Sequence, residues 1–227
     1  MVQRAKEMRF AGGAAVFPGG RIDPEDGALA ARLDPDSDIE VLAARIGGIR
    51  ETLEETGLAI GLSNPVTGEE AAEARAMLLE QGALAPVVER FGWTLAPETL
   101  VPFARWCPKA HGTFDTRFFL ADLGTGAVDI TVDATENTRL FWASAAEALR
   151  LAEAREISVI FPTRRNLDRL ALFSTFDEAR AHCEVTPVET VSPDVVMREG
   201  EKWLIIPDYR ARGYPVEGEP LSKARRG

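Results

Sequence analysis

The spacing of apolar residues before Gly57 predicts a long amphipathic helix over residues 38–55. Ser37–Glu40 has the form of a capping box at its start, and Gly57 is typical of a helix end. The apolar positions follow at steps of four, three and four residues, which places them on one buried face. They are Leu42, Ile46, Ile49 and Leu53.

Other patterns divide the rest of the chain between helices and strands. Ala14–Phe17 is an apolar run stopped by Pro18-Gly19-Gly20, which is typical of a buried strand entering a tight loop. Residues 21–36 are rich in Asp, Pro, Gly and Ala, and no helix is assigned to them. We expect helices over 67–79, 145–153, 162–173 and 175–183, a shorter helical or irregular connection over 80–98, and strands over 100–106, 114–121, 128–132, 138–142 and 202–206.

This order of elements predicts a mixed α/β fold. The length suits one domain, residues 1–227, with an ordinary apolar share of 45%. Residues 59–98 are expected to form an inserted helical region or cap. The basic, Gly- and Pro-bearing residues 208–227 are expected to form a loose tail.

Charge and cysteine content narrow the classes of function. A net charge of −10 argues against binding to nucleic acid or an anionic membrane, while a small anionic substrate bridged by metal ions is allowed. Cys107 and Cys183 lie far apart, outside any metal-ligand spacing, and are expected to be reduced thiols. The chain has no apolar run typical of a signal peptide or a membrane span. We therefore expect a soluble cytoplasmic protein.

Three carboxylates share one face of the predicted helix. Glu51, Glu54 and Glu55 stand at i, i+3 and i+4. Two such charges about 6 Å apart repel by about 3 kcal/mol at an effective dielectric constant near 20, and by much less in free water. The stripe is either a solvated helix face or a cluster that binds a cation.

The residues around this stripe resemble a known family. Arg50-Glu51-Thr52-Leu53-Glu54-Glu55-Thr56-Gly57-Leu58 matches the Nudix pattern R-E-U-x-E-E-x-G-U, where U is apolar. Phe17-Pro18-Gly19-Gly20 resembles the loop that begins the Nudix box. Asp26 stands where the pattern has a glutamate, and the 23 residues 27–49 before Arg50 are longer than the family interval.

The resemblance implies a fold and an activity. The fold would be a Nudix-type α/β/α sandwich with a mixed sheet, and the activity metal-dependent cleavage of a phosphoanhydride bond. Glu51, Glu54 and Glu55, with the Gly20 carbonyl, would hold Mg²⁺ or Mn²⁺, which prefer oxygen ligands. Glu54 would belong to the catalytic machinery, and Arg50 would orient the glutamates.

Further residues resemble the Nudix branch related to peroxisomal coenzyme A diphosphatases, which also carries an insertion in its box. Trp106-Cys107-Pro108 and Phe114–Phe119 carry this resemblance. Glu136 is a candidate metal ligand or general base, or else an ordinary loop carboxylate. Arg117 is a candidate substrate contact, or else a surface ion pair on an alternating strand. Arg9, with Gly13, resembles part of a coenzyme A signature, or else lies beside a glycine turn.

The substrate implied by this branch is coenzyme A or an acyl derivative, cut to 3′,5′-ADP and (acyl-)4′-phosphopantetheine. ADP-ribose and dinucleoside polyphosphates share the reacting group and remain alternatives. A non-catalytic Nudix-like module that senses a nucleotide is an alternative of a different class. The partner is thus a small nucleoside diphosphate derivative, and a homodimer is left open.

Overall fold

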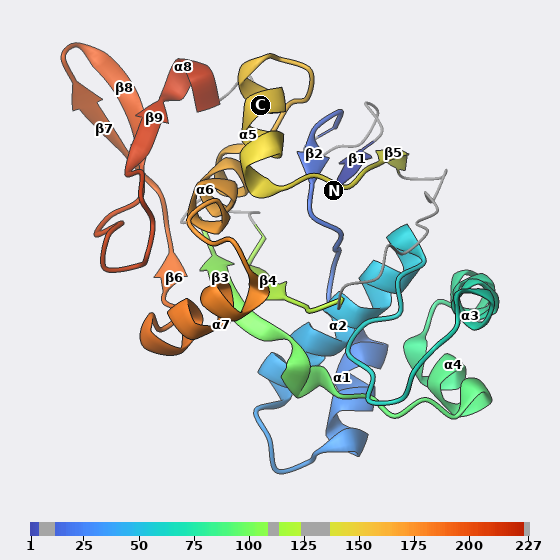
Figure 1. The fold of residues 1–227 in the computed structure, drawn as a ribbon. Coiled ribbons are helices and arrows are strands. Elements are labelled where there is room, and N and C mark those ends of the chain that lie inside the picture. Colours follow the sequence, from blue (N-terminus) through green and yellow to red (C-terminus); the bar gives the residue numbers. More distant parts are fainter. Residues whose placement is uncertain (5–11, 109–113, 124–136, 225–227) are drawn as a thin grey trace.

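The computed structural model describes residues 1–4, 12–108, 114–123 and 137–224 (Figure 1). Helices and strands alternate along the chain, which confirms the expected mixed α/β class. The helices are α1 (Pro24–Leu33), α2 (Ile39–Thr56), α3 (Gly68–Gln81), α4 (Leu84–Phe91), the short 3₁₀ helix η1 (Pro97–Thr99), α5 (Ala145–Glu153), α6 (Phe161–Leu170), α7 (Phe176–Val185) and α8 (Leu221–Ala224).

Within the described residues, the strands form three small sheets. Their orders are β2-β1-β5, β4-β3-β6 and β7-β8-β9. The second sheet is mixed, because β3 pairs antiparallel with β4 and parallel with β6. The strands are β1 (Val2–Arg4), β2 (Ala15–Val16), β3 (Val101–Trp106), β4 (Thr116–Leu120), β5 (Asn137–Leu140), β6 (Thr190–Val191), β7 (Asp194–Arg198), β8 (Glu201–Ile205) and β9 (Gly218–Pro220).

Helix α2 forms where the apolar spacing predicted it, and its stripe is buried as expected. Its first turn is capped by Asp38, whose carboxylate accepts hydrogen bonds from Glu40 N and Val41 N at 3.1 and 3.2 Å. The expected cap at Ser37 is therefore wrong by one residue, and the Ser37 hydroxyl instead donates to the Asp34 carbonyl. Gly57 ends the helix at φ 75°, which glycine adopts without steric cost.

The buried face of α2 is covered by other helices (Figure 1). Leu78 of α3 and Leu84 and Val87 of α4 pack in the same core cluster as Ile46 and Leu53 of α2. The helical content expected for residues 59–98 is thus present, as α3 and α4. These helices pack against the apolar stripe of α2.

Helix α1 was not expected from the sequence. Asp23 precedes Pro24, and proline at the first helical position removes an N–H that would have no partner there. The Asp26 carboxylate accepts a hydrogen bond from Asp23 N at 2.9 Å, which closes the first turn. Leu29 and Ala30 are then buried in the cluster shared with α2. The overall composition of residues 21–36 does not reveal these local helix signals.

The expected loose tail over residues 208–227 is wrong for the part that the structure describes. Tyr214 is buried, and its hydroxyl donates to Asn166 Oδ1 of α6 at 2.9 Å. Glu219 of β9 is also buried and forms an ion pair with Arg165 of α6 at 3.4 Å. The segment is ordered because it covers an aromatic core cluster that includes Trp106.

Most of the remaining expected elements are present. Strands β3, β4, β5 and β8 and helices α3, α5, α6 and α7 match their expected positions within a few residues. The expected strand over 128–132 lies outside the described residues. Over the described part of the chain, no helix has the length and apolar character needed to cross a bilayer. Both cysteines are free thiols.

Candidate active site

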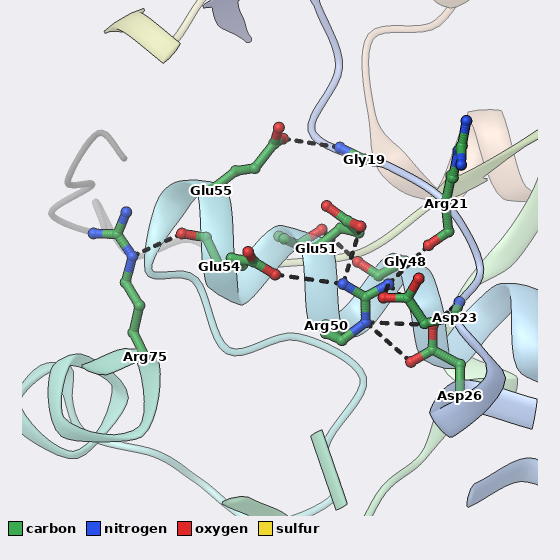
Figure 2. A network of polar contacts seen from close by, with 11 residues as sticks. Gly19, Arg21, Asp23, Asp26, Gly48, Arg50, Glu51, Glu54, Glu55 and Arg75 are labelled. Atoms are coloured by element: carbon green, nitrogen blue, oxygen red, sulfur yellow. Dashed lines mark hydrogen bonds and ion pairs between the residues drawn. The ribbon is translucent and has the colours of Figure 1, made fainter. Parts of the chain in front are cut away.

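Helix α2 presents its three glutamates beside the glycine loop that follows β2 (Figure 2). The side chain of Glu51 is 16% exposed and that of Glu54 is 34% exposed. Glu55 is buried at 7%. Of the two alternatives for this stripe, the solvated face does not describe Glu51 and Glu55, which lie largely out of water.

Arg50 is the centre of the polar network (Figure 2). Its guanidinium donates to Asp26 through Nε and Nη2, both at 3.0 Å, and lies 3.1 Å from an Asp23 carboxylate oxygen. Nη1 donates to Glu51 at 3.0 Å and to Glu54 at 3.4 Å. Burial alone would lower the pKa of Arg50, but the hydrogen bond and charge of Asp26, with Glu51 and Asp23, raise it. Arg50 therefore stays a cation and fixes the two carboxylates on α2.

Asp26 provides the buried anchor for this guanidinium. The residue is 1% exposed, and Asp26 Oδ2 lies 3.2 Å from where a Cβ on Gly47 would stand. Gly47 thus leaves the space in which the carboxylate reaches Arg50. The structure places Asp26 in the network, although 23 residues separate it from Arg50. Those residues include most of α1, which folds back against α2.

The glycine loop contacts two of the glutamates. Gly19 N donates to Glu55 Oε2 at 2.9 Å. A Cβ on Gly20 would overlap the Glu51 carboxylate, so only glycine lets the loop approach it this closely. The structure therefore brings Gly20, Glu51 and Glu55 together.

Burial and the neighbouring charges shift the pKa of Glu51, and they do not all act in the same direction. Desolvation is the largest effect, and it raises the pKa of the Glu51 carboxyl to about 7. Arg50 opposes this rise, while Glu54 and Glu55 add to it. A second cation at this position would favour the ionised form of all three carboxylates.

The donor set suits a hard divalent cation in its chemistry. Glu51, Glu54 and Glu55 supply carboxylate oxygens beside the Gly20 backbone. Among the described residues, however, no three side chains of His, Cys, Asp or Glu are gathered in the geometry of a metal site. Glu54 instead faces Arg50, and Glu55 faces Gly19.

Several contacts in the network were not expected from the sequence. The Arg21 carbonyl accepts a hydrogen bond from Arg50 Nη2 at 2.7 Å, and Arg75 Nε of α3 donates to the Glu54 carbonyl at 2.8 Å. Asp23 could have been identified as the cap before Pro24, and its pairing with Arg50 follows from that position. No local pattern indicates the reach of Arg75 from α3.

The other candidate residues lie apart from this network or outside the described chain. Arg117 forms an ion pair with Glu40 in the first turn of α2. Glu40 is eleven residues from Glu51, or about 16 Å along a helix axis, so Arg117 fits the surface-pair alternative. Arg9 and Glu136 lie outside the described residues.

A comparison with solved structures places this geometry among known proteins. The chain is similar to a Nudix hydrolase from Alicyclobacillus acidocaldarius, with 28% sequence identity and a TM-score of 0.65. The match covers 79% of this chain and 86% of the other. No family profile and no curated protein matches the chain. The chain thus has the Nudix fold, and its likeness to a Nudix hydrolase supports a place in that superfamily.

Proposed function

We propose that the protein is a Mg²⁺- or Mn²⁺-dependent hydrolase that cuts the phosphoanhydride bond of a nucleoside diphosphate derivative. The observation that carries the proposal is the contact of the glycine loop with Glu51 and Glu55, on a helix whose Arg50 is anchored by Asp26. The fold supports pyrophosphate-bond hydrolysis in general.

Each part of the network has a role in this proposal. Arg50 orients Glu51 and Glu54 through its Nη1 donor. Glu55 fixes the loop through Gly19 N. Glu51, Glu54 and Glu55, with the Gly20 carbonyl, would hold the cation, which would neutralise the phosphate charge and lower the pKa of a bound water. Glu136 remains our candidate for the general base.

The preferred substrate is coenzyme A or an acyl-coenzyme A, with ADP-ribose and dinucleoside polyphosphates as alternatives. The preference comes from Trp106-Cys107-Pro108 and Phe114–Phe119, which resemble the coenzyme A branch. The net charge of −10 supports a small-molecule substrate over nucleic acid or an anionic membrane. The two free thiols are in keeping with a cytoplasmic location.

The test is product analysis by mass spectrometry. Coenzyme A, acetyl-coenzyme A, ADP-ribose and a dinucleoside polyphosphate are each incubated with Mg²⁺, with Mn²⁺ and with chelator. Metal-dependent release of 3′,5′-ADP supports the preferred substrate, and much faster turnover of ADP-ribose contradicts it. Glu54→Gln and Glu55→Gln should abolish turnover, while Glu80→Gln, at an exposed position on α3, should not.

A non-catalytic module that binds a nucleotide is the second candidate. It is favoured by the engagement of Glu54 with Arg50 and of Glu55 with Gly19, because a cation would have to draw these carboxylates from their partners. Such a module would bind its nucleotide with or without the Glu55 carboxylate and release no product from any substrate in the panel.

A further inference from the structure

Arg169 of α6 is a buried cation whose guanidinium is only partly satisfied. The residue is 2% exposed, and the guanidinium lies over the Phe103 ring, 4.4 Å from the ring centroid. Nη1 donates to the Phe103 carbonyl at 2.7 Å. Nε and Nη2 are also buried, and among the described residues they have no hydrogen-bond partner. Donors of a buried charged group are thus left without an acceptor, which is costly in free energy.

The groups that could supply a negative charge beside Arg169 are protonated. They are the Tyr214 hydroxyl and the Cys183 thiol. Burial is the largest effect on both groups and raises both pKa values, so neither is an anion at neutral pH. No carboxylate of the described residues lies at ion-pair distance from Arg169. The charge of this guanidinium is therefore not balanced by the described chain.

A second buried donor lies beside the same place. Within the described residues, His182 Nε2 of α7 has no hydrogen-bond partner. A Cβ on Gly213 would stand 2.7 Å from His182 Nε2 and 3.1 Å from Arg169 Nε, so the two nitrogens converge beside Gly213. Desolvation, and then the charge of Arg169, lower the pKa of His182. The ring is therefore neutral at neutral pH, and the tautomer protonated at Nε2 donates toward Arg169 Nε.

Arg169 also lines a small cavity that reaches the surface. The volume of the cavity is about 10 Å³, roughly what one water-sized particle needs. Its charged lining residues are Arg169, Arg212 and Glu189. The Glu189 side chain is 67% exposed and already pairs with Arg212 at 3.0 Å. One carboxylate thus faces two guanidinium groups, which leaves the lining with an excess of positive charge.

We propose that this place binds a small inorganic monoanion of about the size of chloride. Arg169 and His182 donate hydrogen bonds to the anion, and its charge balances that of Arg169. A water molecule would accept the same hydrogen bonds but leave the buried charge unbalanced. The anion joins α6, α7 and the segment around Gly213. These residues are separate from the network around Arg50 (Figure 2), so the site stabilises the fold independently of the proposed hydrolysis.

Chloride NMR on the full chain tests the proposal, because exchange of chloride with a protein site broadens the chloride resonance. The wild type should broaden the resonance at neutral pH and constant ionic strength. Bromide should reverse the broadening by competition, while gluconate, which is too large for the cavity, should not. Equal effects of bromide and gluconate would overturn the proposal, because they would show that chloride binds only to exposed charges.

Three variants assign the broadening to this place. Arg169→Gln should abolish the part that bromide reverses. His182→Phe keeps a ring beside Phe173, which is 4.9 Å away between centroids, and should weaken chloride binding about tenfold, as expected for the loss of one hydrogen bond to a charged group. Arg180→Gln on α7 is the matched control, because it removes the same charge from an exposed side chain and should leave chloride affinity unchanged. Unchanged affinity in His182→Phe would overturn the proposal, even if Arg169→Gln does not fold.

Discussion

The side chains of the candidate site depend on one another through Arg50. Its guanidinium donates to Asp26, Glu51 and the Arg21 carbonyl from three different nitrogen atoms. A buried charge of this kind is stable only while its partners keep their geometry. The site is therefore sensitive to changes that preserve charge but not shape.

Arg50→Lys should destabilise the protein and reduce turnover. A lysine ammonium is a single point charge and cannot meet Asp26, Glu51 and the Arg21 carbonyl in their present positions. We expect a loss of about 3 kcal/mol in the free energy of unfolding, measured by urea denaturation. Arg32→Lys is the control, because the Arg32–Glu89 pair is exposed on both sides and should contribute less than about 0.5 kcal/mol. A loss at Arg50 no larger than at Arg32 would contradict this account.

Glu51 should make the metal-free protein less stable as pH rises. The pKa of its carboxyl is about 7 in the folded chain against 4.5 ordinarily. Between these values the unfolded chain has released the proton that the folded chain keeps, so stability falls as pH rises from about 4.5 to about 7 and then levels off. Glu51→Gln should remove this fall and gain on the order of 3 kcal/mol at pH 8. The free energy of unfolding of the wild type and of Glu51→Gln is measured by urea denaturation in chelator at pH 5 and pH 8. The same difference between the two proteins at both pH values would refute the prediction.

At the scale of elements, the sequence predicted α2 well and α1 not at all. The apolar stripe and Gly57 give α2 a long local signal, and its burial follows from that periodicity. Helix α1 has short signals at Asp23 and Pro24, and its stability depends on Leu29 and Ala30 packing against α2. The contact between Asp26 and Arg50 is a product of that packing, and no local pattern could have shown it.

Gly27 of α1 and Gly20 of the loop before it should respond differently to alanine. Gly27 lies inside α1, where an added Cβ meets nothing within 4 Å, so Gly27→Ala should stabilise the protein by about 0.5–1 kcal/mol. Gly20→Ala should displace the Glu51 carboxylate and lower turnover severalfold. It should change the melting temperature little. Calorimetry and a rate assay on both variants check this, and an unchanged rate for Gly20→Ala would show that the close approach of loop and carboxylate is unimportant.

At the scale of the whole molecule, Tyr214 and its neighbours near the end of the described chain cover the aromatic core cluster that includes Trp106. Residues 208–227 were expected to be loose because they are basic and contain Gly and Pro. Composition carries no information about long-range contacts. Trp106 of β3 donates from Nε1 to Asn166 Oδ1 at 3.2 Å and to Tyr214 Oη at 3.1 Å. Three distant segments therefore meet at one buried polar group.

Tyr214→Phe tests whether this contact stabilises the fold. The change removes a buried hydroxyl that donates to Asn166 and accepts from Trp106, and leaves the ring in place. We expect a loss of about 1–2 kcal/mol in the free energy of unfolding, because both hydrogen bonds of the Tyr214 hydroxyl are removed. The loss is no larger because Trp106 still donates to the Asn166 oxygen. Tyr209→Phe, at a partly exposed ring on the same segment, should change the free energy of unfolding by less than about 0.5 kcal/mol. Equal effects of the two changes would mean that the segment is held by apolar packing rather than by this network.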